Sequence, residues 1–191
     1  MRIHHRRKFL FLSNFKCGST SMRALLDGWF NGERGYWQHR ADRLNVHWSQ
    51  RDWEQVTDWD SYYTFTTVRD PLERLVSEYT WAKVDERGMP FFAADYASGT
   101  PPMPFRDWIL AERYQAKPIC EFAPGANRVF SLHDQRRIVN ELAARFRKDP
   151  GVEMPFVNTT EHGPVSEYYD AETEAAVLKR FASDLAVVKK A

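Results

Sequence analysis

Residues 8–26 have the sequence K-F-L-F-L-S-N-F-K-C-G-S-T-S-M-R-A-L-L, which carries the strongest structural signals of the chain. The apolar residues Phe9–Leu12 predict a short strand, and a turn containing Lys16 and Gly18 leads from it into an amphipathic helix. The first turn of a helix carries unpaired N–H groups and the positive end of the helix dipole, and a glycine lets the backbone approach a ligand closely. The stretch therefore predicts an anion site and suggests phosphate or sulfate chemistry.

Length and composition indicate one globular unit. The chain has 191 residues, of which 43% are hydrophobic and 28% charged, and this is enough for a single domain over residues 1–191 with a real core. The net charge of +1 argues against a general nucleic-acid binder. The locally basic run at residues 2–8 is interpreted as a solvated lead-in to the first strand.

No apolar stretch reaches membrane-spanning length, and the first residues lack the apolar core of a signal peptide, so we expect a cytoplasmic protein without a transmembrane segment. Cys17 and Cys120 are the two cysteines. In a reducing compartment both are expected to be free thiols.

A second strand-to-helix junction follows. Residues 61–69 are dense in aromatic and β-branched types, which predicts a central strand. The Asp-Pro pair at 70–71 then supplies an N-cap and a favoured first helical residue. The apolar stripe of this helix leaves Arg74 and Ser77 on its surface. The junction thus places Arg69 and Ser77 near one end of the sheet.

The remaining chain alternates helical and strand patterns. Helices are predicted at 49–56, 105–112, 134–146 and from 170 to 188, a strand at 127–133, a strand or extended loop at 154–159, and irregular structure at 33–50 and 85–104. Strands alternating with helices favour an α/β fold. We expect a three-layer, P-loop-like arrangement with a central mainly parallel sheet, helices on both faces and the ligand across the carboxyl ends of the strands.

The segments F-K-C-G-S-T-S, residues 15–21, and V-R-D-P-L-E-R-L-V-S, residues 68–77, resemble two motifs of the sulfotransferases that use 3'-phosphoadenosine 5'-phosphosulfate (PAPS). In that family a P-K-x-G-[ST]-[ST] loop binds the 5'-phosphosulfate, and Phe15 here replaces the usual proline. The second motif binds the 3'-phosphate through its arginine and serine. A looser similarity to carbohydrate-type sulfotransferases and their bacterial relatives extends over residues 155–160 and the terminal helix.

This resemblance implies a set of site residues. Those expected to bind PAPS are Lys16, Cys17, Gly18, Ser19, Thr20, Ser21, Arg69 and Ser77. Lys16 is also expected to be catalytic by stabilising charge on the departing nucleotide, and no metal is required. The acceptor would be a hydroxyl or amine of a carbohydrate or small molecule. His47 is the predicted general base, with His39 and then Glu33 as weaker candidates.

Several residues have alternative interpretations. Arg69 is also placed to form an ion pair with Asp70 or Glu73. The tryptophans near the predicted base either form an aromatic platform for the acceptor or, as is commoner, belong to the core; they are Trp37, Trp48, Trp53 and Trp59.

Two rival functions share the strand–loop–helix layout. Cys17 and Arg23 have the C-x5-R spacing of cysteine-dependent phosphatases, in which Cys17 would be the nucleophile. That hypothesis leaves Arg69 and Ser77 unexplained. A non-catalytic module that binds PAPS or its product is the other alternative. A nucleotide-hydrolysing P-loop is excluded because its lysine follows the last glycine, whereas Lys16 precedes Gly18.

Overall fold

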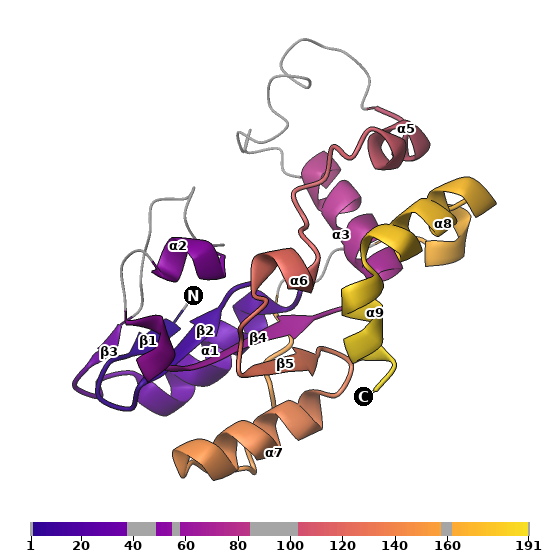
Figure 1. Ribbon diagram of the computed structural model, residues 1–191. Coiled ribbons are helices and arrows are strands. Elements are labelled where there is room, and N and C mark those ends of the chain that lie inside the picture. The colour runs from indigo at the N-terminus through magenta and orange to yellow at the C-terminus, as the bar shows by residue number, and fades with distance from the viewer. Residues whose placement is uncertain (1, 38–48, 55–57, 85–102, 158–161, 191) are drawn as a thin grey trace.

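A five-stranded mixed sheet organises the protein. The computed structural model (Figure 1) describes residues 2–37, 49–54, 58–84, 103–157 and 162–190. The strands are β1 (Arg2–His4), β2 (Phe9–Leu12), β3 (Tyr36–Trp37), β4 (Tyr63–Val68) and β5 (Arg128–Ser131), in the order β3-β1-β2-β4-β5. Strands β2, β4 and β5 are parallel, as predicted for the centre of the sheet, whereas β1 is antiparallel to both β2 and β3. Residues 5–8 join β1 to β2, a connection too short for a parallel crossover.

The basic N-terminal run is a solvated lead-in only over its exposed second half, residues 5–8, and that prediction was wrong for residues 2–4. Residues 2–4 form β1, His4 is buried against the rings of Phe9 and Phe30, and Arg2 forms an ion pair with Asp27. The acidic partner lies far along the chain, so the charge pattern of residues 2–8 alone could not reveal it.

Helices cover the sheet on both faces (Figure 1). They are α1 (Ser19–Phe30), α2 (Gln50–Glu54), α3 (Pro71–Val84), α5 (Phe105–Leu110), α6 (Ile119–Phe122), α7 (Gln135–Phe146), α8 (Ala171–Arg180) and α9 (Ala182–Val188), with short 3-10 turns at Trp59–Ser61 and Val165–Glu167. No helix in these parts of the chain is both long enough and apolar enough to span a membrane.

Alternation along β2 divides the core. Phe9 and Phe11 face one side and pack with α1 and α7, while Leu10 and Leu12 face the other side and pack with α6 and α9. A third cluster beyond the sheet joins α3, α5 and α8 around Phe181.

Aspartate side chains cap the starts of three of the helices. The carboxylate of Asp70 accepts hydrogen bonds from the N–H groups of Leu72 and Glu73, and Asp134 and Asp170 cap α7 and α8 in the same way. The single helix predicted from residue 170 to 188 is instead two helices. The chain bends at Phe181, whose φ and ψ of −106° and 27° leave the helical region, and the bend is followed by a buried Asp184.

Arg74 is fully buried, which corrects its predicted surface position. Its Nε donates to the Phe15 carbonyl at 2.9 Å, Nη2 donates to Asn14 Oδ1 at 2.7 Å, and Nη1 donates to Asp184 Oδ1 at 3.2 Å and to the Lys117 carbonyl at 3.1 Å. This one side chain therefore ties α3 to the turn after β2 and to α9.

We expect Arg74→Met to lower the free energy of unfolding by about 3–5 kcal/mol, because the carboxylate of Asp184 would stay buried without its partner. Urea unfolding followed by circular dichroism measures the loss. Arg106→Met is the matched control: Arg106 pairs with carboxylates at an exposed site where solvent screens the charges, so its loss should lower the free energy of unfolding far less. Equal effects of the two substitutions would contradict the role assigned to Arg74.

Candidate functional site

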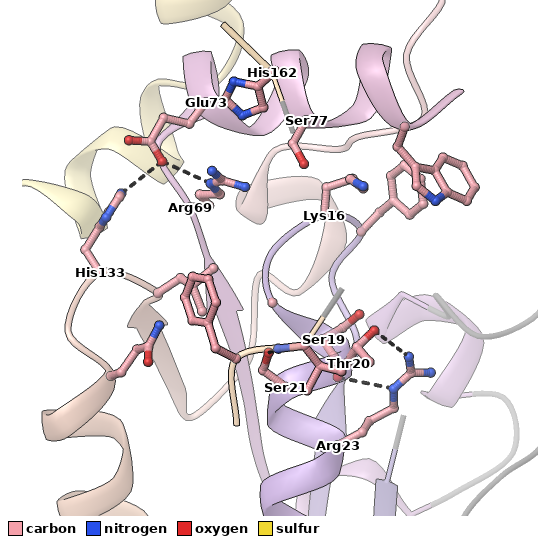
Figure 2. A pocket seen from close by; sticks show the side chains of 17 residues that line it. Lys16, Ser19, Thr20, Ser21, Arg23, Arg69, Glu73, Ser77, His133 and His162 are labelled. Carbon is pink, nitrogen blue, oxygen red and sulfur yellow. Dashed lines mark hydrogen bonds and ion pairs between the residues drawn. The ribbon is translucent and has the colours of Figure 1, made fainter. Parts of the chain in front are cut away.

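A cavity of about 590 Å³ opens at the carboxyl ends of β2 and β4 (Figure 2). Both sequence junctions contribute to it, together with segments that follow β5 and α7. Its lining residues are Phe15, Lys16, Gly18, Ser19, Thr20, Ser21, Arg23, Arg69, Glu73, Ser77, Trp81, Leu132, His133, Gln135, Phe156, Val157 and His162. Seven of the eight predicted binding residues thus line one cavity, and Cys17 does not.

The turn after β2 has the conformation of an anion-binding loop. Lys16 and Gly18 have positive φ angles of 56° and 70°, and α1 begins directly after them. The φ angle of Gly18 favours glycine, and a Cβ atom there would lie 2.4 Å from Leu132 Cδ1, so the Leu132 side chain would have to move to accept a larger residue. Among the described residues, the N–H groups at positions 19–21 have no hydrogen-bond acceptor, which leaves them for a ligand.

Neighbouring side chains orient the hydroxyls of the loop. Arg23 donates from Nη2 to Thr20 Oγ1 at 3.1 Å and from Nε to the Ser19 carbonyl at 3.2 Å. The N–H of Val157 donates to Ser21 Oγ at 3.3 Å, which brings the segment after α7 to the edge of the cavity. Arg23 therefore places a second cation, besides Lys16, next to the loop at residues 16–21.

Lys16 is the most strongly perturbed cation of the cavity. Its pKa is lowered to about 8: burial is the largest cause, Glu78 opposes it by attraction, and Arg69 adds to it by repulsion. The Nζ atom lies 5.1 Å from the centre of the Trp81 ring. The ammonium is thus charged at neutral pH but held in a partly dry setting, where its attraction for an anion is strong.

Arg69 and Ser77 meet Lys16 across the same opening (Figure 2). Arg69 donates through Nε to Glu73 Oε2 at 3.0 Å, so the predicted ion pair exists alongside the cavity position. His133 Nε2 lies 3.7 Å from that same oxygen. The two Nη groups of Arg69 have no partner among the described residues. Ser77, predicted at the helix surface, lines the cavity but is only 5% exposed.

Cys17 lies behind the loop. Its thiol is fully buried, and burial raises its pKa to about 11. Its N–H donates to the Asn14 carbonyl at 3.4 Å, and its own carbonyl accepts from Thr67 Oγ1 at 2.6 Å. A buried, protonated thiol outside the cavity cannot act as the nucleophile of a phosphatase, although Arg23 does line the cavity.

Histidine positions extend the list of possible bases. His47 and His39 lie outside the described residues, so the first two predicted bases stay predictions. His133 and His162 line the cavity and were missed. His133 lies just after β5, at the end of the strand predicted at 127–133. Because ligands bind at the carboxyl ends of parallel strands, this position could have marked His133 as a site residue.

Glu33 is unsuited to accept a proton. Burial alone would raise the pKa of its carboxyl group, but hydrogen bonds from Lys148, Arg7 and His4 outweigh burial and hold the pKa at about 2. Glu33 also lies away from the cavity lining. It fastens the N-terminal strand to the end of α7.

The tryptophans considered as an acceptor platform lie elsewhere or are not described. Trp37 is 62% exposed on β3, and Trp59 is buried in the core with α6 and α9. Trp48 and the side chain of Trp53 lie outside the described residues. The aromatic side chains that do line the cavity are Phe15, Trp81 and Phe156.

The cavity is rich in cations, lies at the carboxyl ends of parallel strands and adjoins a helix start with unpaired N–H groups. These features are typical of an α/β protein that binds anionic groups. Residues 1–119 match the model of the sulfotransferase family, and this is more than half of the chain. The chain therefore belongs to the sulfotransferase family, with sulfuryl transfer as its general activity. Searches of curated proteins and of solved structures gave no match.

We expect a thiol reagent such as dithionitrobenzoate to modify one cysteine of the native protein at mildly alkaline pH and both in denaturant. Cys120 is exposed, whereas Cys17 is buried with a raised pKa. Spectrophotometric counting of released thiolate is the measurement, and Cys120→Ser should leave the native protein unreactive. Rapid modification of Cys17 in that variant would contradict the burial and revive the phosphatase hypothesis.

Proposed function

We propose that the protein transfers a sulfuryl group from PAPS to a hydroxyl or amine of a carbohydrate or small-molecule acceptor. The observation that carries the proposal is the meeting of two separate anion sites in one cavity, the loop around Lys16 and the pair of Arg69 and Ser77. PAPS is a nucleotide with anionic groups on both its 3' and 5' positions, which two such sites would suit. We further propose that residues 1–191 act as one domain with a three-layer, P-loop-like arrangement.

The donor set fits this nucleotide. Lys16, the N–H groups at 19–21 and the hydroxyls of Ser19, Thr20 and Ser21 would hold the 5'-phosphosulfate. The planar guanidinium of Arg69 presents its Nη groups to a phosphate while Glu73 fixes its Nε, and Ser77 adds a hydroxyl. Cys17 would contribute only to the shape of the loop, because its N–H is already bonded within the turn.

The proposed reaction is an in-line displacement. The acceptor oxygen or nitrogen forms a bond to sulfur, the bond from sulfur to the bridging phosphate oxygen breaks, and its electron pair leaves with adenosine 3',5'-bisphosphate. Lys16 stabilises the negative charge that grows on that oxygen. The acceptor proton passes to a base, for which His47 remains our candidate, or to water. His133 and His162 line the cavity as further acceptors for that proton.

The direct test is incubation with PAPS and a panel of sugars, phenols and amines, followed by mass spectrometry. Sulfuryl transfer adds the mass of one SO₃ group to an acceptor. Binding of adenosine 3',5'-bisphosphate without any product would favour the non-catalytic binding module. Absence of binding, together with hydrolysis of an aryl phosphate that Cys17→Ser abolishes, would overturn the proposal in favour of a phosphatase.

Arg69→Ala should weaken binding of adenosine 3',5'-bisphosphate about tenfold to a hundredfold, because a hydrogen-bonded charge on the 3'-phosphate is lost. Binding of adenosine 5'-monophosphate, which lacks that phosphate, should change little. Isothermal titration calorimetry measures both. Arg128→Ala is the matched control, because Arg128 pairs with Glu141 and does not line this cavity. Equal weakening of both nucleotides would argue against Arg69 as the 3'-phosphate ligand.

Nucleotide affinity should fall as pH rises through about 8, because the lowered pKa of Lys16 makes this side chain neutral above that value. Below pH 8 the ammonium is charged and attracts the 5'-phosphate. Lys16→Ala should bind weakly with this pH dependence removed, whereas Lys16→Arg should keep its charge and show no loss over the same range. Calorimetric titrations across this range measure the effect. An unchanged profile in Lys16→Ala would assign the titration to another group.

A further inference from the structure

A groove of about 260 Å³ lies along one edge of the sheet, and it shares no lining residue with the cavity described above. Strand β5 is the last in the order β3-β1-β2-β4-β5 and pairs only with β4 in the described part of the chain. It lies between α7 and α9 (Figure 1). All four residues of β5 line the groove, together with the start of α7 and the end of α9. The groove therefore follows the outer edge of the sheet.

The backbone of β5 has hydrogen-bonding groups that point away from β4. Every second residue of a parallel strand turns both its N–H and its carbonyl to one neighbour. The N–H of Leu132 donates to the Val68 carbonyl at 2.7 Å, so Val129 and Ser131 face outward. The Ser131 carbonyl accepts from the N–H of Asp134 at 3.2 Å. The N–H of Ser131 and both groups of Val129 have no hydrogen-bond partner among the described residues, and such groups can pair with another extended chain.

Positive charge surrounds these backbone groups. Arg128 Nη2 and Arg137 Nε both donate to Glu141 Oε1, at 2.7 Å and 2.8 Å, so one carboxylate serves two guanidinium groups. Lys190 lines the groove, is exposed and forms no ion pair within the described residues. Asp134 uses its carboxylate to cap α7 through the N–H of Arg137. The groove thus keeps an excess of positive charge even when both carboxylates are counted.

Apolar surface lies beside the cations. Val129 and Val187 are partly buried against the core cluster under α9, and the neighbouring Ala186 is exposed. A strand that pairs with β5 would turn alternate side chains to this surface and to the side of α7. Acidic residues that alternate with small apolar residues would suit both sides of the groove.

We propose that this groove binds an extended acidic segment of a partner protein, which adds as a strand beside β5. The outward backbone groups of Val129 and Ser131 would bond to the segment, and its carboxylates would pair with Arg137 and Lys190. The four residues of β5 span about 13 Å at about 3.3 Å per residue, which is enough for a segment of about four or five residues. A second copy of this chain paired through its own β5 would bring like charges together, so charge opposes a dimer at this edge.

Fluorescence anisotropy with labelled pentapeptides and the full chain tests the proposal. The first probe alternates glutamate and valine, the second has the same side chains but N-methylated backbone amides, and the third alternates lysine and valine. We expect only the first to bind well, and to bind more weakly as salt is added. Lys190→Glu should weaken its binding about fivefold or more at low salt. Lys179→Glu is the matched control, because Lys179 is an exposed lysine of α8 outside the groove.

Val129→Pro tests the strand pairing, because it removes an outward N–H and leaves the ladder to β4 intact. It should also weaken binding of the first probe, and thermal unfolding shows whether this variant is folded. If it is not, the amide resonances of Val129 and Ser131 in the native protein decide, since the first probe should shift both.

Lys16→Ala should leave binding of the first probe unchanged, because Lys16 lines the other cavity. Loss of binding in Lys16→Ala, equal binding of the N-methylated probe, unshifted Val129 and Ser131 resonances or no binding at all would overturn the proposal. A native dimer in sedimentation that Val129→Pro dissociates would assign the edge to a second copy instead. These outcomes are independent of sulfuryl transfer, which is tested with PAPS.

Discussion

The buried guanidinium of Arg74 is the interaction on which the arrangement of the site depends. It holds the turn that precedes Lys16 through the Phe15 carbonyl and the Asn14 side chain, and it is itself fixed by Asp184. Because Arg74 belongs to the same helix as Ser77, it links the position of Ser77 to that of the turn before Lys16. A charge buried this deeply is stable only while all its partners are in place, so the geometry is rigid.

Among the described residues, three cations line the cavity, Lys16, Arg23 and Arg69, together with one carboxylate, Glu73. Burial lowers the pKa of Lys16, and repulsion from Arg69 adds to that effect. An anionic ligand would relieve both penalties, which is a reason for such a site to select multiply charged molecules. Glu73 moderates the charge and orients Arg69 through Nε alone. The rings of Phe15 and Trp81 are in edge-to-face contact and add apolar surface to the lining of the same cavity.

Both junctions of the site were predictable because their signals are local. The strand at Phe9–Leu12, the cap at Asp70 and the small residues of the loop each act through neighbours within four positions. Three other features were not predictable in this way: the burial of Arg74, the pairing of β1, and the burial of Cys17 behind the loop. Each depends on contacts between segments far apart in sequence, and arginine in particular is mostly exposed in proteins.

Two patterns that support the proposed chemistry are visible in the sequence alone: a lysine before a glycine at a helix start, and an arginine and a serine eight residues apart at another. These patterns predict anion binding because backbone N–H groups and a guanidinium donate in fixed directions. The tertiary structure was needed to show that the loop around Lys16 and the pair of Arg69 and Ser77 line one cavity and that Cys17 does not. It also places the Trp81 ring beside Lys16. Side chains distant in sequence meet only after packing selects one arrangement of helices on the sheet.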